Sequence, residues 1–275
     1  MTVRVGISGW RYPPWRGVFY PPGLPQRREL EYAASRLATI EVNGSFYSLQ
    51  RPSSWRTWAD TVPADFVFSV KGPRFLTHLK KLADPLGPLA NFLASGVLLL
   101  GERLGPFLWQ LPPDLGFRPD RLEPFLDLLP RTASAASALA AAHHDPAKLK
   151  GHVDTTAPVD VPLRHVLEVR HPSFETPELA PLLRRYDVGL VVADSAGTWP
   201  SLDAVTSDVV YVRLHGDAEL YTSGYTPEAL DRWAERVRGW RDAGHDVFVY
   251  FDNDAKVHAP FDAIALAERL GVGPA

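Results

Sequence analysis

The sequence predicts an α/β fold, a single (β/α)8 TIM barrel over residues 1–275, from three observations. Eight short apolar segments alternate with segments of helical pattern, as expected for strands of a parallel sheet buried on both faces. The length is close to the roughly 250 residues that such a barrel usually has. The alternative, a doubly wound open sheet, usually has a glycine-rich phosphate loop after its first strand, and residues 8–23 (SGWRYPPWRGVFYPPG) contain none.

The predicted strands are short and rich in valine, leucine, isoleucine and phenylalanine. In chain order we expect them at 3–8, 38–43, 66–71, 106–111, 165–170, 189–194, 209–214 and 246–251. Such continuous apolar runs are typical of strands that have no solvent-exposed face.

Helical patterns lie between these segments, and the clearest are 26–38 and 226–243. In the second, Thr226 is the expected N-cap, Pro227 occupies the first helical position and Gly244 follows the end. Shorter helices are predicted at 53–61, 84–95, 119–129, 177–186 and 259–270. The stretch 198–206 supports at most one turn.

One segment interrupts this alternation. Residues 131–164 are rich in alanine, serine and proline, and we interpret them as a partly helical insertion between strands four and five. No other domain boundary and no internal repeat is evident, so we expect one domain.

Composition excludes several classes of site and partner. With no cysteine, the chain has no disulfide, thiolate nucleophile or cysteine metal site. The net charge of −3 provides no global basic field for nucleic acid. The N-terminus lacks the pattern of a signal peptide, and no apolar run is long enough to span a bilayer. We therefore expect a cytoplasmic protein without a membrane partner, and nothing in the sequence indicates its oligomeric state.

Polar side chains gather where the predicted strands end, and in a TIM barrel the carboxyl ends of the strands build the active site. These candidates are Ser8, Trp10, Glu41, Asn43, Lys71, Arg74, His78, Gln110, Glu168, Arg170, His171, Asp194, Ser195, Arg213, His215, Asp252, Asn253 and Asp254. Three strands carry polar residues two apart, which share a face. The pairs are Glu41 with Asn43, Glu168 with Arg170, and Arg213 with His215. We interpret them as parts of one polar ring at the barrel mouth.

Seven motifs resemble the YecE-like family, domain of unknown function 72. They are SGWRYPPWRGVFYP, IEVNGSFYSL, FVFSVKGPRFLTH, LGPFLWQLPP, LEVRHPSF, YVRLHG and VYFDND, and they cover almost the whole chain. The resemblance implies a TIM barrel and supplies no reaction. It adds Phe46, Tyr47 and Pro112 to the characteristic positions. The chain departs from the family pattern in the long segment 131–164 and in Asp262-Ala263, where the family usually has Asn-Ala.

From this ring we predict an enzyme, a hydrolase or an isomerase/lyase, acting on a small polar, anionic or sugar-like substrate. Lys71, Arg170 and Arg213 would clamp a phosphate or carboxylate group. Glu41 and Glu168 would serve as general acid and base. Further candidates for proton transfer are His215 and Asp252. Residues expected to contact the substrate are Trp10, Asn43, Tyr47, Arg74, His78, Gln110, His171, Asp194 and Asn253.

Two alternative functions remain open. Glu168, Asp194, His215 and Asp252 resemble in their order the ligands of endonuclease-IV-like and xylose-isomerase-like barrels, which would give a metal-assisted phosphodiesterase or isomerase. Apart from that divalent metal ion, no cofactor is predicted. A non-catalytic barrel that binds a ligand or nucleic acid is the other class, with nucleic acid not favoured. The aromatic residues at 10–20 would either stack on a sugar or base or plug the barrel rim.

Overall fold

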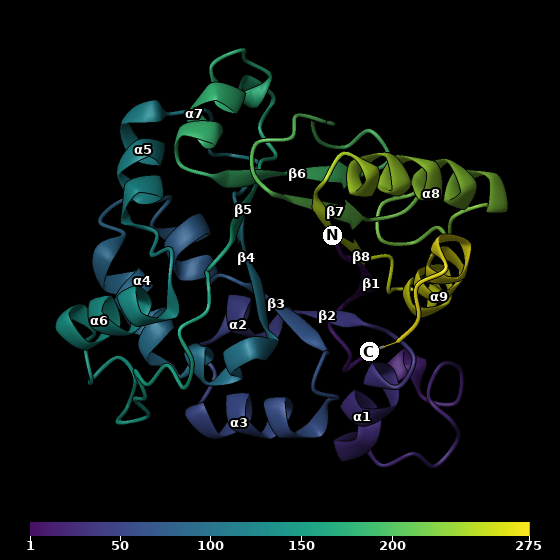
Figure 1. The fold of residues 1–275 in the computed structure, drawn as a ribbon, viewed down its shortest axis with the longest axis horizontal. Helices are drawn as coiled ribbons and strands as arrows, with labels where there is room; N and C mark the ends of the chain where they lie inside the picture. Colours follow the sequence, from purple (N-terminus) through teal and green to yellow (C-terminus); the bar gives the residue numbers. More distant parts are fainter. Residues whose placement is uncertain (275) are drawn as a thin grey trace.

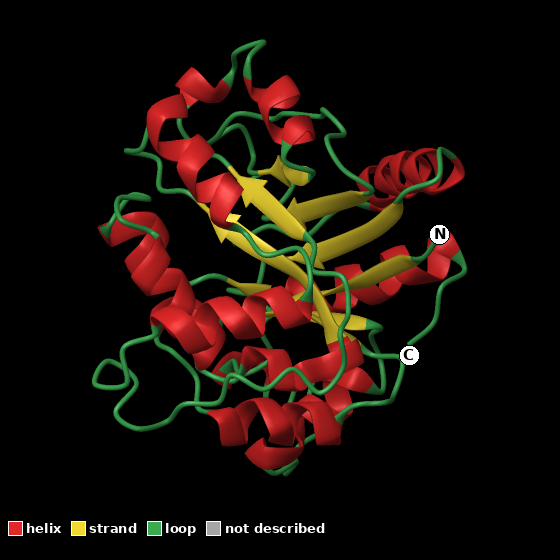
Figure 2. Cartoon of the chain, turned by 60° about the vertical axis from the view of Figure 1, so that its left-hand side comes forward, coloured by secondary structure: helices red, strands yellow, loops and turns green. Residues whose placement is uncertain are grey.

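The computed structural model describes residues 1–274, and it confirms a closed barrel of eight parallel strands in sequence order, β1 to β8. Figures 1 and 2 show these strands at the centre, with helices surrounding them. The strands are β1 (Val3–Ser8), β2 (Thr39–Val42), β3 (Val67–Lys71), β4 (Leu104–Gln110), β5 (His165–Glu168), β6 (Val188–Asp194), β7 (Val209–Leu214) and β8 (Asp246–Phe251). All eight predicted strands are present, and no end is shifted by more than two residues. Arg170, predicted inside a strand, follows the end of β5.

The barrel interior is filled by alternate residues of the strands. An apolar group that includes Leu108, Val191 and Phe248 packs inside the barrel. Tyr250 also lies inside, and its hydroxyl is 2.7 Å from Oγ1 of Thr39 and 2.6 Å from Oγ of Ser69. Because the interior is packed beneath the mouth, only the carboxyl ends of the strands are left for a site.

Nine helices lie between and outside the strands in the described part of the chain. They are α1 (Glu29–Ala34), α2 (Gly44–Tyr47), α3 (Pro52–Thr61), α4 (Leu86–Ala94), α5 (Pro119–Leu128), α6 (Ala133–His143), α7 (Leu179–Arg185), α8 (Pro227–Asp242) and α9 (His258–Leu270). The predicted cap of α8 is confirmed, since Thr226 Oγ1 accepts a hydrogen bond from the amide of Ala229.

The helix predicted at 26–38 is shorter than expected. Residues Gln26–Arg28 form a 3₁₀ turn, and α1 ends at Ala34. Just beyond that end, Ser35 donates a side-chain hydrogen bond to the carbonyl of Tyr32, a bond that competes with continued helix. No helix forms between β6 and β7 within the described residues, in keeping with the weak pattern at 198–206.

Residues 131–164, which we predicted to be an insertion, contain the helix α6. This helix packs against α4, and Figure 1 shows the two side by side at the outer edge of the molecule. Asp154, later in the segment, pairs with Arg56 of α3. The segment therefore extends the helical layer around α3 and α4. Within residues 1–274, no helix has both the length and the apolar character that a membrane crossing needs.

Candidate active site

The centre of the barrel mouth is Arg213, whose side chain is 0% exposed. Its guanidinium reaches carboxylates from three other strands or their ends. Nη2 donates to Glu41 Oε1 at 2.8 Å and to Asp252 Oδ2 at 2.9 Å, and Nη1 donates to Glu168 Oε2 at 2.9 Å. Five donors in a planar fork allow arginine to join several carboxylates at once. We call this set of four residues the Arg213 network.

Glu41 is fully enclosed in this network. Oε2 accepts hydrogen bonds from Nε of Arg213 at 3.0 Å and from the hydroxyl of Tyr211 at 2.7 Å. Oε1 accepts from the hydroxyl of Ser8 in addition to Arg213. Both oxygens are thus occupied by protein donors, as a buried carboxylate requires.

Glu168 and Arg170 satisfy each other, which explains why a buried strand ends in two charges. Arg170 Nε donates to Glu168 Oε1 at 2.8 Å, and Gln110 Nε2 lies 3.0 Å from both oxygens of Glu168. Burial opposes ionisation of Glu168, but the charges of Arg170 and Arg213 outweigh it and hold the pKa well below its usual value. The guanidinium of Arg170 also stacks on Trp199, with Cζ 3.6 Å from the ring centroid.

Asp252 is the carboxylate of the Arg213 network that keeps contact with solvent, with 13% of its side chain exposed. Burial opposes its ionisation, yet the charge of Arg213 holds its pKa well below the ordinary value. His215 Nδ1 lies 3.0 Å from Asp252 Oδ2, without the alignment of a good hydrogen bond. Burial and the charge of Arg213 lower the pKa of His215, so its imidazole is neutral at pH 7.

The pKa of the next carboxylate along the chain, Asp254, is shifted in the opposite direction. Burial and the negative charge of Asp252 raise its pKa to about 6. Two neighbouring carboxyl groups with pKa values shifted in opposite directions are the usual arrangement for a general acid and a general base. Asp254 is thus a further candidate residue of the site, one to which the sequence pattern alone assigned no role.

Lys71, at the end of β3, is 7% exposed and differs from the other charges of the mouth. Within the described chain no ion pair or hydrogen bond involves its Nζ, which lies 4.3 Å from the ring centroid of Phe46. Burial, followed by the charge of Arg213, lowers its pKa to about 8. His78 shares this environment: burial, then the charges of Lys71, Arg170 and Arg74, lower its pKa to about 4. This side of the mouth is therefore a cationic edge, made of Lys71, Arg74 and Arg170.

A cavity of about 250 Å³ adjoins the mouth above β1 and β2. Of the predicted contact residues, Trp10, Asn43 and Tyr47 line it, and Oδ1 of Asn43 is buried without a partner. Tyr47 is 70% exposed at its rim. These three residues are thus brought together beside the network.

Three predicted site residues bind elsewhere. Asp194 accepts a hydrogen bond from the hydroxyl of Tyr225 at 3.1 Å, and burial raises its pKa. Asn253 donates to the carbonyl of Ser223 and to Asp262. His171 Nδ1 accepts from the amide of Ser173 at 3.1 Å. All three therefore stabilise loops around the mouth in this structure.

The aromatic loop after β1 forms a plug. Trp15, Phe19 and Tyr20 are buried and contact one another through their rings. Trp15 donates from Nε1 to the carbonyl of Asp254, so the plug also fixes the loop after β8. Of this loop, Trp10, Arg11 and Tyr12 reach the cavity.

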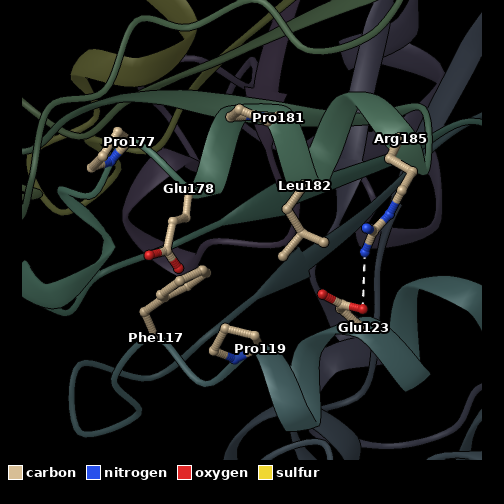
Figure 3. A pocket seen from close by; sticks show the side chains of 8 residues that line it. All are labelled: Phe117, Pro119, Glu123, Pro177, Glu178, Pro181, Leu182 and Arg185. Carbon is tan, nitrogen blue, oxygen red and sulfur yellow. Dashed lines mark ion pairs between the residues drawn. The ribbon is translucent and has the colours of Figure 1, made fainter.

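A larger cavity of about 620 Å³ lies on the outside of the barrel between α5 and α7 (Figure 3). Proline, leucine and phenylalanine side chains line it, and the ion pair of Arg185 with Glu123 lies at one end. It contains none of the predicted site residues, so we place the candidate site at the mouth.

Comparison with known proteins is consistent with this architecture. Residues 4–275 match the family described as "Protein of unknown function DUF72". The chain belongs to the DUF72 family. The resemblance identified from the seven motifs is thereby confirmed.

Solved structures of DUF72 proteins share the fold. The crystal structure of a DUF72 family protein from Thermotoga maritima is 26% identical and superposes with a TM-score of 0.75 over 98% of this chain and 100% of that one. A DUF72 family protein from Enterococcus faecalis is 17% identical, with a TM-score of 0.73 over 99% of this chain and 96% of that one.

Curated DUF72 relatives match over less than half their length. UPF0759 protein YecE of Escherichia coli (strain K12) is 29% identical over 129 residues, which are 46% of this chain and 44% of YecE. UPF0759 protein YunF of Bacillus subtilis (strain 168) is 23% identical over 116 residues, 40% of each chain.

Two aromatic residues of this DUF72 protein were not singled out from the sequence. Trp199 and Tyr221 lie in the loops after β6 and β7, and their rings contact His215 with centroids 5.6 and 5.3 Å away. Their position in loops at the carboxyl ends of strands was the available signal. Asp262, where the family usually has asparagine, accepts hydrogen bonds from Asn253 and from the amide of Tyr225, so it holds two loops of the mouth together.

The lowered pKa of Asp252 predicts how the stability of this DUF72 protein depends on acid. A carboxyl whose pKa is lower in the folded than in the unfolded state stabilises the fold above its unfolded pKa of about 3.9, and this contribution is lost as pH falls further. Between pH 7 and pH 2.5 the free energy of unfolding of the wild type, measured by urea denaturation, should therefore fall by more than that of Asp252→Asn. The expected difference is more than about 1.4 kcal/mol, the equivalent of one pKa unit. A difference that stays constant with pH would contradict the lowered pKa.

Proposed function

We propose that the protein is an enzyme that binds a small anionic substrate at the carboxyl end of the barrel and acts on it by acid/base chemistry. The observation that supports this most is the cationic edge, where Lys71 has no carboxylate partner. A buried cation without a partner costs several kcal/mol, so a binding role accounts for its presence. A phosphate or carboxylate group of the substrate would supply the missing charge.

Acid/base roles follow from the two carboxyl groups after β8. Asp254, with a pKa of about 6, is matched to donate and accept protons near neutral pH. Asp252, ionised and partly exposed, is the companion base, and the neutral His215 lies beside it. Aromatic surface from Trp199 and Tyr221 would cover the bound substrate.

Glu41, Glu168 and Arg213 receive a different role in this proposal from the one the sequence suggested. All oxygens of Glu41 and Glu168 accept bonds from protein donors, and Arg213 donates only to protein groups among the described residues. They are positioning residues that hold Arg170 and Asp252 in place. Clamping of the anion then depends on Lys71, Arg170 and Arg74.

The metal-assisted alternative fits the donor set less well. Arg213 occupies the space between Glu41, Glu168 and Asp252 that a divalent ion would need, and its charge would repel such an ion. Asp194, another ligand of that alternative, is hydrogen bonded to Tyr225. We derive no step through a metal ion.

Thermal denaturation with a panel of anions tests the proposal. The panel comprises inorganic phosphate, sugar phosphates and small carboxylic acids, and the proteins are the wild type, Lys71→Met and Lys80→Met. A binding anion at about a hundredfold excess over Kd adds about 2.7 kcal/mol to the stability. We expect this stabilisation in the wild type and in Lys80→Met, whose altered side chain lies outside the mouth, and its loss in Lys71→Met.

Asp254→Asn then separates an enzyme from a binding protein. If the protein is an enzyme, this variant keeps the anion-induced stabilisation and loses turnover of the anion that binds. Equal stabilisation of wild type and Lys71→Met by every anion would refute the proposal. Anion binding without turnover in the wild type would favour a non-catalytic binding barrel.

A further inference from the structure

We propose that Lys71 is a nucleophile whose Nζ forms an imine with the carbonyl carbon of a small anionic aldehyde or ketone. This inference rests on the proposed function, because it names the substrate class of the same site. The position of Lys71, the absence of a partner for its amine and the cations beside it support the inference.

Lys71 differs from every other lysine of the chain. The remaining five, Lys80, Lys81, Lys148, Lys150 and Lys256, are exposed or half-buried. Lys81 lies 2.6 Å from Asp114, and Lys80 lies 3.9 Å from Asp84. Lys71 alone is buried, and it is placed at the carboxyl end of a barrel strand, where catalytic residues of TIM barrels lie.

The Arg213 network leaves the amine of Lys71 without a counter-ion. All three carboxylates near the barrel axis are bonded to Arg213, which gives them little capacity for a second cation. The charges of Glu41, Glu168 and Asp252 still favour the ammonium form, but none of them lies within ion-pair distance of Nζ, which is 4.3 Å from the ring centroid of Phe46. A buried amine beside another cation loses its proton more readily, and the neutral form is the nucleophile. The pKa of about 8 agrees with this geometry.

The neighbours of Lys71 suit an anionic group on the same molecule. Arg170 uses Nε and Nη2 for Glu168, and in the described chain Nη1 donates to no protein group. Stacking on Trp199 holds this guanidinium in one plane. Arg74 is exposed at the same edge, and its charge acts on His78. A carbonyl compound with a phosphate or carboxylate would place its charge there and its carbon at Nζ.

The step balances without a further reactant. The ammonium group loses a proton, Nζ attacks the carbonyl carbon, and the π electrons of the C=O bond pass to oxygen, which takes up a proton while Nζ releases its second one. The resulting carbinolamine takes up a second proton and loses water as the C=N bond forms. Overall, one ammonium and one carbonyl give one protonated imine and one water, with no change in oxidation state.

Trapping with sodium borohydride tests the imine, because reduction converts it to a stable secondary amine. The full-length protein is incubated with glyoxylate, with dihydroxyacetone phosphate or with uncharged acetaldehyde, then reduced and digested with trypsin. An adduct at Lys71 blocks cleavage there, so residues 57–71 and 72–74 are recovered as one peptide. We expect at least about tenfold more adduct at Lys71 than at Lys80 with one of the two anionic probes, since more of Lys71 is unprotonated at pH 7.

Two variants of Lys71 distinguish loss of its amine from loss of the fold. Lys71→Met and Lys71→Arg should both give no adduct in the 57–74 peptide, and Lys80→Met should trap as the wild type does. Lys71→Arg retains a cation, so it should keep part of the anion-induced thermal stabilisation. Circular dichroism spectra of all three variants confirm that they are folded.

The outcomes separate this inference from the proposed function. Adducts spread evenly over the exposed lysines, or equal trapping in Lys71→Met, would overturn the imine. If anions in that case still stabilise the wild type but not Lys71→Met, the proposed function stands. Equal trapping of acetaldehyde and glyoxylate at Lys71 would support the amine as nucleophile and contradict recognition of an anionic substrate.

Discussion

Replacing Arg213 with methionine is expected to lower the free energy of unfolding by about 3 to 5 kcal/mol, the usual effect of removing one partner from a buried ion pair. The guanidinium is the shared partner of Glu41, Glu168 and Asp252, and Glu41 and Arg213 are 0% exposed. Without it, three carboxylates remain close together in a medium of low dielectric constant. They repel one another and have to take up protons or admit water.

Urea denaturation at pH 7 measures this effect, with Arg185→Met as the matched control. Arg185 pairs with Glu123 on the surface, both side chains being substantially exposed, so its loss should cost less than about 1 kcal/mol. If the two variants lose similar amounts of stability, the Arg213 network does not hold the mouth together. Arg213→Lys, which retains the charge but not the planar fork, should fall between them.

The second large effect has the opposite sign: Lys71→Met should stabilise the protein at pH 7 by about 3 kcal/mol. The pKa of Lys71 falls from 10.5 to about 8 on folding, and each pKa unit corresponds to about 1.4 kcal/mol. Below pH 8 the folded protein has to accommodate a buried ammonium that water would solvate better. Methionine fills a similar volume without that charge.

The pH dependence of this difference identifies its cause. Between pH 8 and pH 10.5 the unfolded chain binds a proton at Lys71 that the folded chain lacks, so the wild type gains stability with rising pH. The advantage of Lys71→Met should therefore shrink across this range, as measured by urea midpoints at successive pH values. An advantage that is constant with pH would indicate improved packing instead. Together with loss of anion binding, the expected result would show that the site is maintained at the expense of stability.

The strands were predictable because strands buried on both faces have continuous apolar sequences. The positions of the strand ends follow from where these apolar sequences end. Because residues two apart share a face, the sequence predicted that Glu41, Glu168 and Arg213 belong to one polar ring at the mouth, and in the structure they are joined by ion pairs. Parity fixes the face on which a side chain lies, and it does not determine its partner. For that reason the sequence did not distinguish an arginine bonded to three carboxylates from one free to clamp a substrate.

Loops were harder to predict because they have no periodicity. Asp194 was expected at the mouth from its strand, and its partner, Tyr225, comes from the loop before α8. Trp199 lies in the connection between β6 and β7, which contains no helix. Neither a periodic apolar pattern nor a capping pattern there indicates the position of its side chain. The shifted pKa of Asp254 depends on Asp252 and on burial under the aromatic plug, which are both consequences of the closed fold.

The Arg213 network also bears on the order in which the chain folds. Glu41 and Arg213 are separated by 172 positions in the sequence, and Arg213 and Asp252 come from the last quarter of the chain. In the N-terminal half of the barrel Glu41 is present without Arg213. In the C-terminal half Arg213 is present without Glu41. Arg213 therefore has all three of its carboxylate partners only when the ring closes. Contacts this distant are slow to form, so closure of the mouth belongs to the late stages of folding.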